Sequence, residues 1–96
     1  MITTPIHESP QARSPTHPGL SLRDDLLPLL GLSVTEAARQ MQVSRITLSR
    51  FINGRSSMTV DMALRLEGLG LGNAEDWLTQ QVRYDLLLKR NENHKT

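Results

Sequence analysis

Three arginines, Arg45, Arg50 and Arg55, stand close together in the middle of this chain. Residues 43–57 contain no acidic side chain, whereas residues 59–96 hold six acidic residues against five lysines and arginines. Guanidinium groups bind phosphate oxygens and the edge of guanine, so this local excess of positive charge indicates a nucleic-acid-binding surface. The net charge of +1 carries no such information. On charge alone, a solvated basic face without a ligand remains the alternative.

A short helix is expected immediately before the arginines. Ser33 and Glu36 have the spacing of a capping box, so the helix should begin at about Val34. Its apolar residues follow helical spacing and should share one buried face; they are Val34, Ala37, Ala38 and Met41. The small side chain of Ala38 would let a second helix cross closely.

The arginines themselves belong to a second short helix, expected from Arg45 to about Asn53 after a turn of about three residues. Ser44 can cap its start, and Gly54 can end it in a left-handed conformation. Leu48, Phe51 and Ile52 would face inward together with the turn residue Val43. The outward face then presents Arg45, Ile46, Ser49 and Arg50.

Composition argues against several classes of function. The chain has no cysteine, which excludes disulfides and thiolate metal sites. His7, His17 and His94 lie in or near the ends, and no carboxylate pair is tied to a pocket, so no enzyme, metal or cofactor is predicted. Because no long apolar run or signal sequence is present, we expect no membrane span and a cytoplasmic protein.

The chain divides into three parts. Residues 1–16 are rich in proline and polar residues and are predicted to be a flexible N-terminal tail, either simply disordered or folding on a partner through Ile2 and Ile6. Residues 17–90 form one domain, and residues 91–96 a disordered C-terminus. Further helices are expected from Pro18 to near Leu27, where Pro28 ends or kinks the helix, from 60 to 69, and from 74 to 89. The helix from Pro18 should bury Leu22, Leu26 and Leu30 on one side, with Leu27 and Leu29 adding to its apolar side. The helix from 60 to 69 should bury Met62, Ala63, Leu66 and Leu69.

The last helix carries more apolar residues than one small core can absorb. Two adjacent lines of side chains run along it, and the second continues to Leu86 with Leu87 beyond. An exposed apolar strip on a terminal helix favours pairing with a second copy across a two-fold axis. The predicted dimer contacts are Trp77, Leu78, Val82, Leu86 and Leu87.

Residues 34–53 resemble the helix-turn-helix of the Cro and lambda-repressor superfamily at the packing positions Ala38, Val43, Leu48 and Ile52. They differ at Gln42, where that family usually has glycine. The turn is therefore expected to be strained or to use another C-terminal cap, and Gln can adopt positive φ at modest cost.

Several motifs over residues 17–88, namely HPG, GLS, NGR, DMALRL and WLxxQxxYDL, together resemble the HigA family of antitoxins. The departures are Gln42, an early Pro28, Gly68 and Gln80. This resemblance implies an all-α, five-helix Cro/lambda-repressor-like domain. It further implies a homodimer that represses its own operon and neutralises a HigB-like toxin, a RelE-like mRNA endonuclease.

Double-stranded operator DNA is the expected partner of the second helix, which at about 13 Å fits a major groove about 12 Å wide. Arginine can bind guanine and Ile46 a thymine methyl group, while Thr35 and Arg55 are placed for phosphate. A dimer would read a palindrome with half-sites about 10 base pairs apart. The predicted DNA contacts are Thr35, Ser44, Arg45, Ile46, Thr47, Ser49, Arg50 and Arg55.

A stand-alone XRE-type repressor without a toxin remains the alternative, and the WLxxQxxYDL segment argues against it. For the toxin contact, both the N-terminal tail and the apolar remainder of the outer helices are candidates.

Overall fold

The computed structural model describes residues 16–95, and all regular structure in that range is helical. Three segments follow one another without a break and form the first helix: α2 (Pro18–Ser21), the π-helical turn η2 (Leu22–Leu26) and α3 (Leu27–Leu30). The other helices are α4 (Val34–Met41), α5 (Arg45–Ile52), α6 (Val60–Gly68) and α7 (Ala74–Lys95). This confirms the predicted all-α fold of five helices. Apart from Thr16, the predicted N-terminal tail lies outside the described residues.

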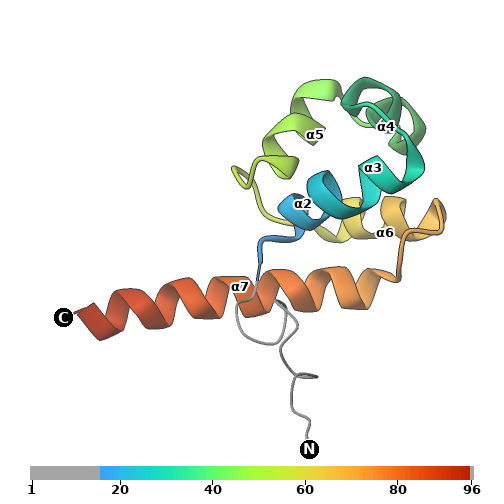
Figure 1. Ribbon diagram of the computed structural model, residues 1–96. Coiled ribbons are helices and arrows are strands. Elements are labelled where there is room, and N and C mark those ends of the chain that lie inside the picture. The colour runs from blue at the N-terminus through green and yellow to red at the C-terminus, as the bar shows by residue number, and fades with distance from the viewer. Residues whose placement is uncertain (1–15, 96) are drawn as a thin grey trace, which may run out of the picture.

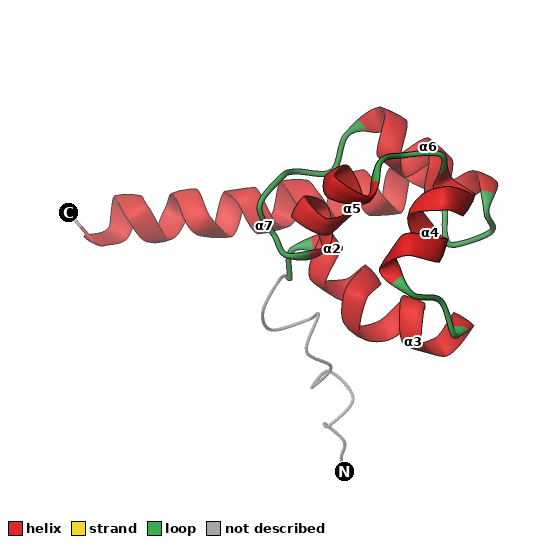
Figure 2. Cartoon of the chain, turned by 90° about the horizontal axis from the view of Figure 1, so that it is seen from above, coloured by secondary structure: helices red, strands yellow, loops and turns green. Residues whose placement is uncertain are grey.

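The first four helices cluster together, and α7 lies against one side of the cluster with its C-terminal half extending beyond it (Figure 1). Seen from above, α7 leaves the cluster as a long projecting arm (Figure 2). The core lies between the helices, and its most deeply buried large side chains are Phe51, Leu22, Leu48 and Leu66. None of the described helices is long and apolar enough to span a membrane.

The first helix differs from its prediction because of the π-helical turn. The helix does not end near Leu27 but continues to Leu30, and the Leu27 N–H donates to the carbonyl of Leu22, five residues back. The extra residue in this turn rotates the rest of the helix, so Leu22 and Leu27 are buried together while Leu29 and Leu30, predicted on the apolar side, are 80% and 46% exposed. A wide turn also suits Pro28, which has no N–H to donate to a tight one.

Four helix starts carry a side-chain cap, including the two predicted at Ser33 and Ser44. At each start, a side-chain oxygen accepts the backbone N–H three residues further on, which satisfies a donor that has no partner within the helix. The four pairs are Ser33 with Glu36 at 3.1 Å, Ser44 with Thr47 at 3.0 Å, Thr59 with Met62 at 3.0 Å and Asn73 with Asp76 at 2.8 Å. The starts of α4, α5, α6 and α7 are therefore confirmed.

Two helix ends correct the prediction. α7 continues to Lys95, so residues 91–95 are helical rather than disordered. The stretch after Lys89 contains no proline or glycine, and an exposed ion pair between Lys89 and Glu92, at 3.5 Å, supports one more turn. The second correction concerns α6, which ends at Gly68 rather than at Leu69. Leu69 therefore lies outside the helix and is 37% exposed instead of buried.

Gly19 of α2 packs closely against the backbone at the end of α5. A Cβ atom at Gly19 would lie 1.8 Å from the carbonyl oxygen of Phe51. No side chain fits there without moving one helix away from the other. Glycine is therefore needed at this position for contact rather than for backbone flexibility.

We expect Gly19→Ala to lower the free energy of unfolding by about 3 kcal/mol or more, because the new methyl group collides with backbone that cannot move aside cheaply. Gly68→Ala is the matched control, since a Cβ there meets nothing within 4 Å. That control should raise stability by up to about 1 kcal/mol through helix propensity. Chemical denaturation measures both variants, and equal stability of Gly19→Ala and wild type would contradict the close approach.

Candidate nucleic-acid interface

The turn between α4 and α5 contains a left-handed glutamine. Gln42 has φ 61° and is the one described non-glycine residue with positive φ. Its N–H and that of Val43 donate to carbonyl groups of the last turn of α4, with Val43 N–H bound to the oxygen of Ala38 at 3.1 Å. This is a left-handed C-terminal cap built without the usual glycine. The three-residue turn predicted for the motif, from Gln42 to Ser44, is confirmed.

Arg65 of α6 holds this turn from outside. Its Nη1 donates to the carbonyl oxygens of Met41 at 3.0 Å and Gln42 at 3.3 Å, while its Nε donates to Asp61 at 2.8 Å. These bonds satisfy carbonyl groups that α4 leaves unpaired where it ends. The spacing of Asp61 and Arg65 could have indicated an ion pair within α6, but the reach of Arg65 to the turn was not predicted.

The start of α5 lies beside the start of α4, and one hydrogen bond joins the two. Arg45 Nε donates to the hydroxyl of Thr35 at 3.0 Å. Both side chains are exposed, and Ile46 next to Arg45 is 72% exposed. An apolar side chain held so far into solvent makes no contribution to the core. The structure thus brings these three predicted contact residues to one surface.

The predicted contact residues differ in how free their polar groups are. Ser44 caps α5 and also donates to the Thr47 hydroxyl at 2.8 Å, so both hydroxyls already serve the fold. Ser49 is half-buried. The side chains of Arg50 and Arg55 are exposed and lie along the same helix and just past its end. The strongest polar candidates on this surface are therefore its arginines.

Arg23 was not predicted, yet it lies at the far end of the same surface. Its Nη1 donates to Asn53 at 3.4 Å, and its Nε to the carboxylate of Asp24 at 2.8 Å. The Arg23 guanidinium lowers the pKa of the Asp24 carboxyl through this hydrogen bond. Because Asp24 offsets the charge of Arg23, this pair adds little to the positive field around α5.

His17 was predicted only to lie near the N-terminal end of the chain, but it is a buried residue of the fold. The side chain is only 3% exposed. Its Nδ1 accepts the N–H of Gly19 at 2.9 Å, and its Nε2 lies 2.9 Å from the carbonyl oxygen of Ser56. Since the Gly19 N–H donates to Nδ1 and the Ser56 carbonyl can only accept, these two bonds assign the ring hydrogen to Nε2.

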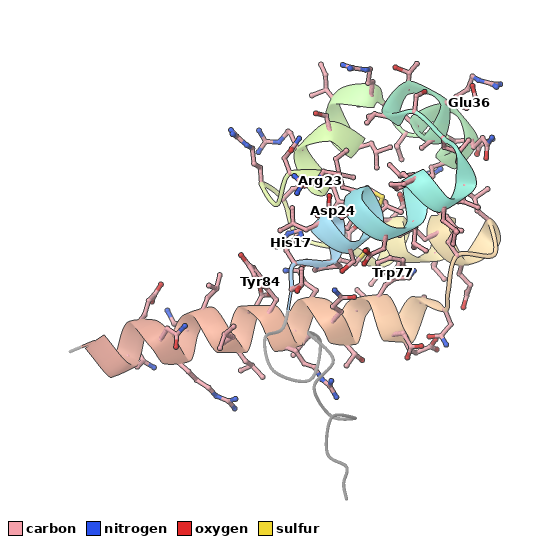
Figure 3. All side chains as sticks on the ribbon, in the orientation of Figure 1. His17, Arg23, Asp24, Glu36, Trp77 and Tyr84 are labelled. Carbon is pink, nitrogen blue, oxygen red and sulfur yellow. The ribbon has the colours of Figure 1, made fainter. Side chains whose placement is uncertain are left out.

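The ring of His17 also joins α5 to α7. Its centre lies 5.6 Å from that of Phe51 on α5 and 5.2 Å from that of Tyr84 on α7, the second contact being edge-to-face (Figure 3). The histidine before Pro18, at the start of a helix, was a usable signal for a cap. Nothing in the sequence indicated its long-range partners.

The five predicted dimer contacts do not form one exposed strip. Trp77 belongs to the core, with 7% exposure and its Nε1 donating to the carbonyl oxygen of Leu71 at 2.7 Å, which corrects its assignment to the strip. Leu78 and Leu87 are half-buried. Val82 at 54% and Leu86 at 43% are exposed, so these two residues can contact a partner.

Comparison with known proteins assigns the chain to a family. A family model described as helix-turn-helix matches residues 22–69, which is half of the chain. The chain belongs to this helix-turn-helix family. Proteins of this family are regulators and not enzymes, and among residues 16–95 no group of three His, Asp or Glu side chains could hold a metal ion.

Two curated relatives illustrate the family. Virulence-associated protein A' of Dichelobacter nodosus is 40% identical over 75 residues, which cover 77% of this chain and 64% of that protein. An uncharacterised HTH-type transcriptional regulator of Haemophilus influenzae is 35% identical over 74 residues, covering 77% of this chain and 69% of that regulator. The present helix-turn-helix chain thus spans just under two thirds of the first relative.

A solved structure supports the specific resemblance seen in the motifs. The antitoxin HigA of Pseudomonas aeruginosa, determined with the higBA promoter, superposes with a TM-score of 0.78 at 32% identity. The match covers 84% of this chain and 88% of that chain. The predicted likeness to the HigA antitoxins is confirmed.

We expect His17→Ala to lower the free energy of unfolding by about 2–4 kcal/mol, because it removes a buried ring and leaves the Gly19 N–H and the Ser56 carbonyl unpaired. His17→Asn keeps a side-chain oxygen that can accept the Gly19 N–H, so it should lose about 1 kcal/mol less than alanine. Thermal and urea denaturation of both variants would check this order, and a harmless His17→Ala would contradict the described network.

Proposed function

We propose that this chain is the antitoxin of a toxin–antitoxin module, binding its operator as a homodimer to repress its own operon. We further propose that this chain neutralises a HigB-like toxin, a RelE-like mRNA endonuclease. The observation that carries the proposal is the exposed, arginine-bearing face of α5 in a chain that resembles an antitoxin solved with its promoter. Because operator DNA and mRNA are the targets, the proposal places the protein in the cytoplasm.

DNA recognition would use the outward face of α5. A helix of 8 residues is about 12 Å long and enters a major groove of similar width. Arg50 can bind guanine through O6 and N7, and Ile46 can contact a thymine methyl group. Arg45 can also bind guanine, once its guanidinium group gives up the hydrogen bond to the Thr35 hydroxyl. The exposed Ile46 supports this role, since nothing in the fold requires it.

Backbone contacts would orient the helix in the groove. Thr35 at the start of α4 and Arg55 just beyond α5 lie at the two ends of the surface, where phosphates pass on either side of a major groove. Ser44, Thr47 and Ser49 would add hydrogen bonds to phosphate or base edges.

Two copies are needed because one short helix contacts too few bases for useful selectivity. We assign the dimer contact to α7, through Leu78, Val82, Leu86 and Leu87. Val82 and Leu86 are exposed in the single chain, which supports this assignment. A two-fold dimer would read a palindromic operator with half-sites about 10 base pairs apart, or a multiple of that.

A stand-alone repressor without a toxin is the second candidate. The Haemophilus relative, named only as a transcriptional regulator, is the observation that favours it. Both candidates share the DNA-binding surface, so DNA binding and toxin neutralisation require separate tests.

We expect Arg50→Ala to weaken binding to the operator by about 1–3 kcal/mol and to relax its sequence preference, because a base contact is lost. Arg55→Ala should weaken binding to operator and random duplexes alike, since phosphate carries no sequence information. Fluorescence anisotropy with both duplexes, at fixed salt concentration, separates the two roles. Equal losses of both variants on both duplexes would refute the assignment.

The antitoxin role is tested by expressing the product of the adjacent reading frame alone and then with this chain. We expect growth arrest that this chain relieves, with the two proteins eluting together from a size-exclusion column. Arrest that persists in the presence of well-expressed antitoxin, or the absence of any complex, would contradict it and favour the stand-alone repressor.

A further inference from the structure

An apolar groove of about 510 Å³ lies between the first helix and the start of α7. One wall consists of Leu26, Leu29 and Leu30, and the other of Leu71 and Trp77, with the glycine-rich turn of residues 70–72 between α6 and α7. Figure 3 shows Trp77 rising from α7 toward the helices packed on it. We call this feature the leucine groove.

The groove contains leucines that the single chain does not need. Leu29 is 80% exposed and Leu30 is 46% exposed, since the π-helical turn rotates both out of the core. Trp77, in contrast, is fixed by its hydrogen bond to the Leu71 carbonyl. A rigid floor beside exposed leucines has the form of a site that a partner's apolar side chains complete.

The charge around the groove indicates what kind of partner fits. The lining residues fall within residues 26–30 and 70–80, which contain two acidic residues and no lysine, arginine or histidine. The two acids are Glu75 and Asp76, and Asp76 itself lines the groove. The local charge at the groove is therefore negative.

The negative charge at the groove is opposite to the charge on the outward face of α5, which we call the α5 surface. Residues 43–57, which include this surface, carry three arginines and no acid. The leucine groove and the proposed DNA contacts have no residue in common. Operator DNA, a polyanion, is disfavoured beside the groove. A second copy docking groove to groove would bring like charges together, so the groove fits neither DNA nor its own equivalent.

We propose that the leucine groove seats an apolar segment of the toxin that is flanked by lysine or arginine. This inference rests on the proposed antitoxin function. An enzyme that cleaves mRNA must present basic residues to the phosphates of its substrate, and an apolar groove with acidic surroundings is complementary to such a surface. Since the DNA contacts lie elsewhere on the chain, toxin and operator can be bound at the same time.

The test uses Leu29→Lys, with Leu64→Lys of α6 as the matched control. Both leucines are exposed, at 80% and 52%, and only Leu29 lines the groove. With the product of the adjacent reading frame as the probe, calorimetry should give at least a ten-fold weaker complex for Leu29→Lys and an unchanged one for Leu64→Lys. Asp76→Asn should weaken binding several-fold and reduce its salt dependence, whereas Glu92→Gln, at the far end of α7, should do neither.

Each result that differs from these expectations has its own interpretation. If the wild-type chain forms no complex with that product, the antitoxin function itself is contradicted. If wild type binds and Leu29→Lys binds equally well, the groove is not the toxin site although the antitoxin function stands. The oligomeric state of Leu29→Lys, measured by analytical ultracentrifugation, and its affinity for operator DNA should equal those of wild type. A shift of this variant to monomer would overturn the proposal in favour of a second copy in the groove.

Discussion

One buried contact determines where the proposed recognition helix points. The backbone of Gly19 meets the carbonyl of Phe51 so closely that no side chain fits between them. His17 bonds to Gly19 and to Ser56, and its ring packs between Phe51 of α5 and Tyr84 of α7. The orientation of α5 relative to α7 therefore depends on a buried histidine ring. In a dimer paired through α7, the same contact would set the distance between the two copies of α5.

Charge is divided between two surfaces of the chain. Arginines and one exposed isoleucine occupy the α5 surface, while exposed leucines and acidic residues surround the leucine groove. Hydrogen bonds of Arg65 to the turn before α5 hold the start of that helix without using Ile46 or Arg50. This separation lets one small domain offer a polyanion-binding surface and a second surface for a basic protein.

Local signals were enough to predict most of the fold. Capping residues such as Ser44 and the helical spacing of the apolar residues located the starts of four helices, because both act within one or two turns. The π-helical turn was not predictable in this way, since its single extra residue leaves no mark on composition, yet it moves Leu30 out of the core. The partners of His17 and Arg65 were missed because each lies far away in sequence. Residues of the α5 surface were identified correctly as exposed, except that Ser49 is half-buried.

DNA binding by the outward face of α5 is best tested by NMR. Backbone amide chemical shifts would be recorded while the protein is titrated with a duplex of the DNA that lies upstream of its own gene. We expect large changes along α5 and at the start of α4, around Arg50 and Thr35, with little change at Leu29 in the groove. Changes centred on the groove or on the exposed end of α7, with α5 unaffected, would contradict it.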